Sequence, residues 1–145
     1  MEKIKIRRLR YNEIFEIIKL HKDSIVPLWK KLKRPYSFKK IEDYIKENFN
    51  KEKFFVIDNG KIIACGSIAF DKFSSIKKAF IGMLLVARKE QGKGYGKGMV
   101  DFLENYARKR GVKELNLDVL IKNPAVKFYK HLGYKDYKLI MNKKL

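Results

Sequence analysis

The chain has 145 residues, a length that fits one domain spanning residues 1–145, and its hydrophobic content of 46% excludes a disordered protein. It contains 35 Lys or Arg against 16 Asp or Glu, so its formal net charge is +19 at pH 7. Such an excess of cations favours anionic partners, for example nucleic acid or a polyphosphate ligand. No apolar run reaches the ~18 residues of a membrane span, so we expect no membrane partner and a cytoplasmic location.

Cysteine and histidine usage argues against a metal site or a thiol nucleophile. The single cysteine, Cys65, excludes an intrachain disulfide and a multi-cysteine zinc site, and it has neither a His nor an acid near it in the sequence. His21 and His131 lie on expected helices and lack the spacing of metal ligands. We therefore expect no bound metal and interpret Cys65 as a buried core residue.

Hydrophobic periodicity predicts the elements in chain order. Alternating residues predict a strand over residues 3–9, and helical spacing predicts a helix that begins with Asn12 as its N-cap. Residues 27–36 are expected to form a basic connection, and a second helix is expected from Ser37.

A β-hairpin is predicted next, with strands over residues 54–57 and 62–70. The connecting dipeptide Asn59-Gly60 is typical of a type I′ turn, in which both central residues have positive φ. The remaining predicted elements are a strand over 79–86, a helix that follows a glycine-rich segment and ends near Gly111, a strand over 115–119, a helix over 124–132 and a last strand over 134–142. This order of strands and helices predicts an α/β fold with a mixed sheet.

Four glycines at alternate positions, residues 92, 94, 96 and 98, lie between a predicted strand and a predicted helix. Exposed N–H groups and the helix dipole make such a loop an anion site. The spacing does not match a dinucleotide fingerprint, and it does not match a P-loop, because Gln91 replaces the first glycine and Gly98 replaces the Ser or Thr. A flexible loop that only eases a tight turn is the alternative interpretation.

Two segments resemble the GNAT superfamily of acetyl-CoA-dependent N-acetyltransferases. The loop from Gln91 to Gly96 resembles the family's motif Gln/Arg-x-x-Gly-x-Gly/Ala, and residues 123–134 are similar to a second motif that contains Asn, Ala, an aromatic-Tyr pair and Gly-Phe/Tyr. The resemblance implies an α/β (α+β) fold with a mixed, mostly antiparallel sheet flanked by four helices. Only twelve residues follow Gly133, so we expect about six strands, and an acceptor side that is open or completed by a second copy in a homodimer.

The resemblance also implies acetyl-CoA as cosubstrate. Loop N–H groups would hold the pyrophosphate, and the end of the preceding strand would pair with the pantetheine amides. The implied cofactor-binding residues are Leu84, Leu85, Val86, Gln91, Gly92, Lys93, Gly94, Tyr95, Gly96, Lys97, Asn123 and Tyr129.

Catalytic candidates follow from the same resemblance. Tyr129 occupies the position of the acid that protonates the departing thiolate. Some relatives carry a glutamate base on the strand before the glycine loop, but that position is Phe80 here. Asp118, on the strand predicted over 115–119, is the candidate base, and a water chain is the other possibility.

The predicted function is transfer of the acetyl group of acetyl-CoA to a primary amine of a small molecule, peptide or protein, by direct attack in a ternary complex. Two alternatives stay open: a basic nucleic-acid-binding module, suggested by the charge, and a GNAT fold that binds the cofactor without transfer, suggested by Phe80. Specific nucleic-acid binding is not expected, because the sequence contains no recognised nucleic-acid-binding motif. The acceptor amine is not identified, although the positive field disfavours polycationic acceptors.

Overall fold

The computed structural model describes residues 3–145, and its five strands form one sheet in the order β1-β2-β3-β4-β5. The strands are β1 (Ile6–Arg8), β2 (Lys53–Asp58), β3 (Ile62–Asp71), β4 (Lys78–Val86) and β5 (Glu114–Leu117). All neighbouring strands are antiparallel except β4 and β5, which are parallel. The prediction of a mixed, mostly antiparallel sheet is therefore confirmed.

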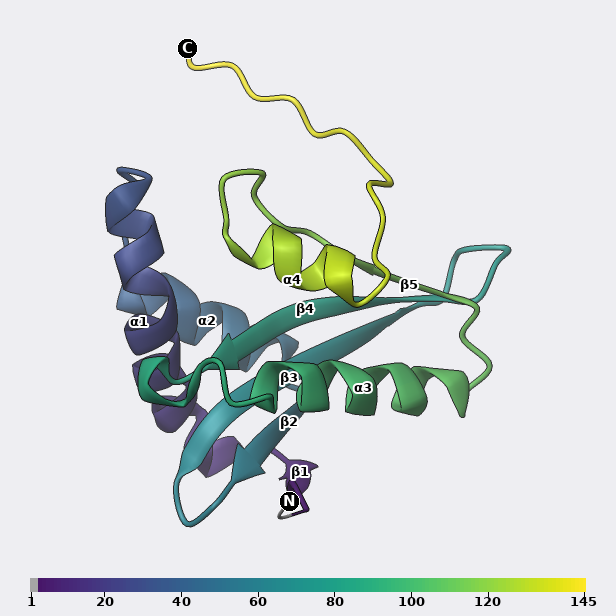
Figure 1. Cartoon of the computed structure of the whole chain (residues 1–145), viewed down its shortest axis with the longest axis horizontal. Coiled ribbons are helices and arrows are strands. Elements are labelled where there is room, and N and C mark those ends of the chain that lie inside the picture. The colour runs from purple at the N-terminus through teal and green to yellow at the C-terminus, as the bar shows by residue number, and fades with distance from the viewer. Residues whose placement is uncertain (1–2) are drawn as a thin grey trace.

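Four α-helices cover the two faces of this sheet (Figure 1). They are α1 (Ile14–Lys31), α2 (Phe38–Asn48), α3 (Tyr95–Arg108) and α4 (Ala125–His131), with two 3-10 turns, η1 (Tyr11–Glu13) and η2 (Arg88–Glu90). Apolar residues of α1 and α2 form one core with the sheet, and Met99, Leu103 and Ala107 of α3 form a second core on the opposite face. The helix count expected from the sequence is confirmed.

The first helix differs at both ends from its prediction. Asn12 lies inside η1 and does not cap α1, which begins at Ile14. The expected connection over residues 27–36 is wrong at its start, because α1 continues through Pro27 to Lys31. Proline removes one N–H donor, but the following turn keeps its hydrogen bond from Leu32 N to Leu28 O at 2.9 Å. The second helix is confirmed, since the hydroxyl of its N-cap Ser37 accepts a hydrogen bond from the next turn.

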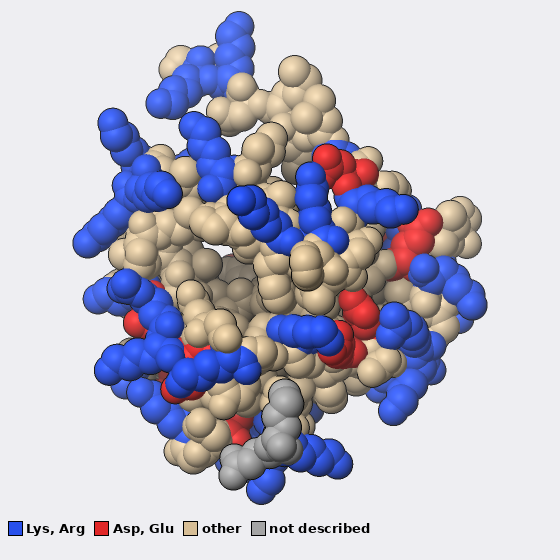
Figure 2. Space-filling view, viewed as in Figure 1, with Lys and Arg blue, Asp and Glu red and all other residues tan. Residues whose placement is uncertain are grey.

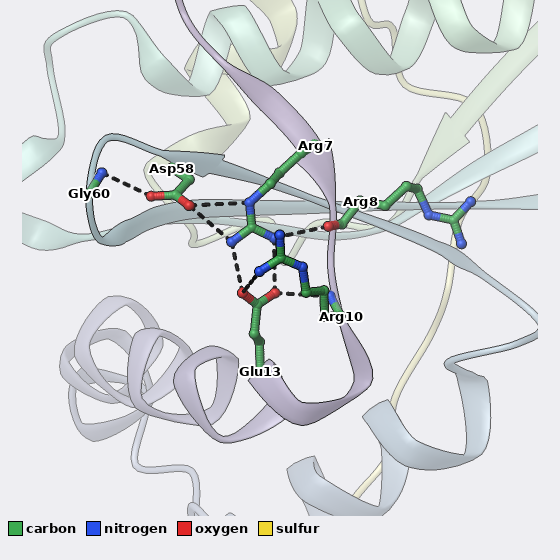
Figure 3. Close-up of polar contacts among 6 residues, drawn as sticks. All are labelled: Arg7, Arg8, Arg10, Glu13, Asp58 and Gly60. Atoms are coloured by element: carbon green, nitrogen blue, oxygen red, sulfur yellow. Dashed lines mark hydrogen bonds and ion pairs between the residues drawn. The ribbon is translucent and has the colours of Figure 1, made fainter.

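The hairpin between β2 and β3 forms, but its turn is not type I′. Gly60 has φ +101°, whereas Asn59 is not among the positive-φ residues of the described chain. The carboxylate of Asp58 accepts the Gly60 N–H at 2.9 Å, and the register shifts beside Asp58. Arg7 in turn binds both Asp58 and Glu13, at 3.0 and 2.8 Å, so β1, η1 and this turn are tied together (Figure 3). The contact between Arg7 and Asp58 joins residues 51 positions apart, so the dipeptide Asn59-Gly60 could not predict it.

The last predicted strand, over residues 134–142, does not form, so the described sheet has five strands and not six. The segment leaves α4, contacts the body through Tyr134 and through Tyr137, whose hydroxyl accepts a hydrogen bond from Lys78 Nζ at 2.9 Å, and then extends away as a tail (Figure 1). Its large apolar side chains are exposed, Leu139 at 73% and Met141 at 85%. A strand needs a neighbour to pair with, and β5, the edge strand, offers only four residues. The alternation of apolar residues predicted a strand, but the described chain has no strand beside which it could pair.

Candidate active site

The two parallel strands, β4 and β5, separate partway along β4, at the edge of the sheet. Register pairs join β4 to β5 only from Lys78 to Ile81, which lie opposite Glu114 to Leu117. From Gly82 to Val86, β4 continues without β5 beside it, while the chain after β5 rises toward α4 (Figure 1). The unpaired edge contains Leu84, Leu85 and Val86, three residues predicted to bind the cofactor. An exposed strand edge of this kind can pair with the amides of an extended ligand.

A β-bulge marks the point of separation. Ser67 of β3 pairs with Met83, and Ile68 pairs with Ile81, so Gly82 is an extra residue without a partner on β3. A bulge bends a strand and re-aims its side chains. The bend falls at the residue where β4 leaves β5.

The glycine loop connects this edge to the N-terminus of α3. Gly94, the N-cap residue, has φ +91°, a left-handed conformation that favours glycine over residues with a side chain. Its carbonyl accepts the first helical bond from Gly98 N at 2.9 Å. Within residues 3–145, no protein group accepts a hydrogen bond from the N–H groups of residues 92–97. The predicted residues Gly92, Lys93, Gly94, Tyr95, Gly96 and Lys97 thus contribute main-chain donors at the positive end of a 14-residue helix.

Side chains fix the loop on both sides. Gln91 Nε2 donates to the carbonyl oxygen of Val86 at 3.0 Å, and the carboxylate of Asp23 on α1 accepts the N–H of Arg88 at 2.8 Å. The lysines of the loop are partly neutralised, because Lys93 pairs with Glu90 at 3.0 Å and Lys97 pairs with Asp101 at 2.8 Å. The main-chain N–H groups, rather than the lysine charges, are therefore the fixed part of the anion site.

The other predicted residues lie on or near α4. Phe128 packs against the start of α3, where a Cβ on Gly96 would lie 3.4 Å from its ring. The neighbouring Tyr129 is half-buried, with ring centroids 5.2 Å from Phe128 and 5.9 Å from Tyr134, and burial raises its pKa to about 12. A phenol in this environment stays protonated at neutral pH and can donate a proton. Asn123 accepts the N–H of Ala125 at 2.9 Å and so stabilises the first turn of α4.

Asp118 lies one residue beyond the end of β5, which ends at Leu117 and not at residue 119 as predicted. Its side chain is exposed to solvent. Phe80, in the position where some relatives have a glutamate, is 40% exposed on β4. Neither the strand pairing nor a hydrogen bond in the described chain brings Asp118 to the unpaired edge of β4.

A carboxylate that sequence reasoning missed does reach β4. Glu52 precedes β2, is only 8% exposed, and accepts a hydrogen bond from Tyr44 Oη of α2 at 2.9 Å. A Cβ built on Gly82 would lie 2.8 Å from Oε1 of Glu52, so the carboxylate covers the bulge. The local sequence Lys51-Glu52-Lys53 is typical of a solvated surface. The available signal was the isolated glycine in a strand, which indicates a bulge or a close approach.

Cysteine and histidine take no part in this arrangement. Cys65 is fully buried on β3, and burial raises the pKa of its thiol to about 12, which excludes a reactive thiolate. Burial lowers the pKa of His21 to about 4, and its Nδ1 lies 3.1 Å from Tyr36 Oη. Residues 3–145 contain no cluster of His, Cys, Asp and Glu suited to a metal ion. None of the described helices is long and apolar enough to cross a membrane.

The charge of the protein surrounds the site but does not fill it. Figure 2 shows a hollow on the face where Figure 1 draws the end of β4, between α1 and α4. Uncharged side chains form its floor, and Lys and Arg lie around it. An anionic ligand is therefore attracted to the surroundings of the hollow, whereas its floor suits an uncharged group.

Comparison with known proteins gives one consistent result. The model of the acetyltransferase (GNAT) family matches residues 15–134. A protein from Pyrococcus furiosus described as an acetyl transferase is 30% identical, with a TM-score of 0.77, over 99% of this chain and 100% of that one. Glucosamine-6-phosphate N-acetyltransferase from Arabidopsis thaliana is 25% identical, with a TM-score of 0.63 and 99% of both chains covered.

A predicted acetyltransferase from Clostridium acetobutylicum, solved with acetyl-CoA, has the same fold at 22% identity and a TM-score of 0.74, covering 98% of this chain and 96% of that one. The family match includes both segments whose resemblance was noted in the sequence, the glycine loop and residues 123–134. The chain belongs to the GNAT acetyltransferase family.

Proposed function

We propose that the protein transfers the acetyl group of acetyl-CoA to a primary amine. The observation that supports this most directly is the continuity between the unpaired edge of β4 and the free N–H groups of residues 92–97. The unpaired edge of β4 can pair with the amides of the pantetheine arm of coenzyme A. The N–H groups that follow can bind its pyrophosphate, which is joined to that arm. The neighbour solved with acetyl-CoA supports the same ligand.

The residues present fit this ligand along two connected surfaces, with two further side chains that hold these surfaces in place. Leu84, Leu85 and Val86 offer main-chain groups to the pantetheine amides, and residues 92–97 offer N–H groups to the phosphates. Gln91 keeps the two parts together through its bond to Val86. Asn123 supports the position of α4, on which Tyr129 lies.

The reaction needs a neutral amine, a stabilised oxyanion and a proton for the leaving thiolate. We assign the last role to Tyr129, whose hydroxyl stays protonated because burial raises its pKa to about 12. The nitrogen attacks the thioester carbonyl carbon, the carbon–sulfur bond breaks, and Tyr129 gives its proton to sulfur before it is reprotonated by water. Asp118, the base expected from the sequence, is exposed beyond the end of β5, so we leave the base open here.

The test is a direct assay of acetyl transfer. The purified protein is incubated with acetyl-CoA and a panel of butylamine, glycinamide, glucosamine and a capped acidic peptide with one lysine. Free coenzyme A is measured with a thiol reagent, and the acetylated amine is identified by mass spectrometry. Formation of an N-acetyl product supports the proposal. Binding of acetyl-CoA without transfer to any amine contradicts it and leaves a cofactor-binding GNAT protein.

A further inference from the structure

Two buried oxygen atoms near the bulge in β4 have no hydrogen-bond partner in the described chain: Oε2 of Glu52 and Oγ of Ser67. Both lie around the main chain of Gly82, because a Cβ at this glycine would be 3.0 Å from each of them. The carboxylate occupies the space that a side chain at residue 82 would need, so it packs directly on the main chain of the bulge. Unpartnered buried polar atoms are rare in folded proteins and call for an explanation.

The Glu52 carboxylate has no cationic partner among the neighbours described. The protein has a net charge of +19, yet the neighbours identified around this carboxylate are Tyr44 from α2 and Cys65 and Ser67 from β3, none of them a cation. Burial raises the pKa values of both Tyr44 and Cys65, so these groups are neutral at pH 7. An ionised carboxylate with one hydrogen bond has lost much of its hydration without a counterion. Such a site favours a cation supplied from outside.

The position of the carboxylate connects it to the acetyl-transfer site. It covers Gly82, the residue at which β4 bulges and loses its pairing with β5. The unpaired edge that would hold the pantetheine begins at the same residue. Glu52 also comes from the side of the sheet that carries α1 and α2, the face opposite to α3 and its glycine loop. An amine that reaches Glu52 therefore approaches the edge of β4 from the side away from the phosphate site.

We propose that Glu52 binds the ammonium group of the acceptor at the bulge and removes its proton, with Tyr44 holding the carboxylate in place. This rests on the proposed acetyl transfer. One ammonium proton passes to the Glu52 carboxylate and then to water, and the freed lone pair forms the carbon–nitrogen bond. The nitrogen then loses a second proton to water. The carbon–sulfur bond breaks with its electron pair on sulfur, and this thiolate takes the proton of Tyr129. The net change is one amide, one thiol and one released proton.

This assignment narrows the acceptor to a chemical class. A single buried carboxylate binds one ammonium group, and the surrounding positive field opposes further cationic charge. The acceptor is therefore a molecule with one primary ammonium group whose remaining part is neutral or acidic. Some relatives carry a glutamate base at the position of Phe80 on β4. In this chain we assign that role to Glu52.

The experiment compares Glu52→Gln with a matched control, Glu47→Gln, which removes the same charge from an exposed position near the end of α2. Glutamine keeps the size of Glu52 and still accepts the hydrogen bond of Tyr44 through its amide oxygen. With the best acceptor of the panel, we expect kcat/KM of Glu52→Gln to fall at least ~100-fold, within the range for loss of a general base. The increase of kcat/KM with pH should be absent from Glu52→Gln. Its acetyl-CoA dissociation constant should stay within about twofold of wild type.

A second variant, at Gly82, tests the role of Glu52 without replacing the glutamate itself. Gly82→Ala keeps the carboxylate but places a Cβ 2.8 Å from it, so the flexible end of Glu52 must move away. We expect a loss of rate of roughly tenfold or more with an unchanged thermal shift on adding acetyl-CoA. Wild-type rates, within threefold, in Glu52→Gln overturn the inference and leave the proposed function intact. A wild-type protein that binds acetyl-CoA but acetylates no amine overturns both.

Discussion

The side-chain amide of Gln91 donates a hydrogen bond to the main-chain oxygen of Val86 at 3.0 Å and closes the turn between β4 and the glycine loop. Val86 ends the strand edge that is free of β5, and Gln91 begins the segment with free N–H groups. One uncharged contact therefore sets the distance between the two surfaces proposed to hold acetyl-CoA. Because neither group titrates near neutral pH, this contact is independent of pH over that range.

Acetyl-CoA should stabilise the protein, and Gly94→Val should abolish this effect. A ligand at ~100 times its dissociation constant adds ~2.7 kcal/mol to the free energy of unfolding. Valine at residue 94 disfavours φ +91°, which distorts the N-cap and its N–H groups. Gly60→Val is the matched control, because Gly60 has φ +101° in a hairpin turn far along the chain from the loop. Both variants should melt earlier than wild type in thermal unfolding, but only Gly60→Val should keep the ligand-induced shift.

Tyr129→Phe should reduce turnover by ~10²–10⁴-fold while changing the acetyl-CoA dissociation constant less than about twofold, because the hydroxyl acts only as the thiolate leaves. With its pKa raised to about 12 by burial, Tyr129 stays protonated across pH 6–9 and should give no alkaline limb in that range. Tyr134→Phe is the control, since its hydroxyl binds Glu104 at 3.1 Å and has no proposed role in the reaction. A Tyr129→Phe enzyme within threefold of wild type would remove this residue from the mechanism.

The protein should lose stability as pH falls from about 7 to 5, because burial lowers the pKa of His21 to about 4. The unfolded chain binds a proton near pH 6.5 and the folded one does not, so unfolding is favoured between these pH values. The loss between pH 7 and 5 should be about 2 kcal/mol, measured by urea unfolding at both pH values. His21→Gln should reduce the pH dependence, whereas His131→Gln, at an exposed position, should keep it. Equal pH dependence in wild type and His21→Gln would contradict the assignment.

Binding to nucleic acid should be weak and non-specific. The +19 charge gives any duplex some affinity, but log K should fall with log salt by roughly 0.9 for each phosphate neutralised. Fluorescence anisotropy with duplexes of unrelated sequence should therefore show little binding at physiological salt and no preference among them. Tight, sequence-dependent binding at physiological salt would favour the nucleic-acid alternative over the enzyme.

The sequence predicted the parts of the site whose geometry is local. The free N–H groups and the left-handed N-cap of α3 lie within residues 91–98, so a few consecutive residues were enough to predict them. The second motif likewise gave α4 and Tyr129. Contacts between distant segments were not predictable. Glu52 and Gly82 are 30 positions apart, and their contact depends on how the segment before β2 packs on the bulge of β4.

Two predictions made from local patterns failed. Residues 27–31 were expected to belong to a basic connection, but α1 continues through Pro27, because a proline costs one hydrogen bond and the following turn keeps its own. Residues 134–142 alternate like a strand, yet a strand is stable only beside another, and the described chain provides no neighbour for it.

Asp118→Asn should leave turnover close to wild type, which separates the two acids considered for the base. Asp118 is exposed beyond the end of β5, where water can take up a proton without it. Glu52 lies buried against the bulge at which β4 leaves β5. Replacement by asparagine keeps shape and hydrogen bonding, so a change in rate would report the loss of the carboxylate itself. The measurement is kcat/KM across pH 6–9 for Asp118→Asn and Glu52→Gln with the same acceptor. A hundredfold loss in Asp118→Asn, with Glu52→Gln unaffected, would return the base to the residue predicted from sequence and leave Glu52 as a structural carboxylate.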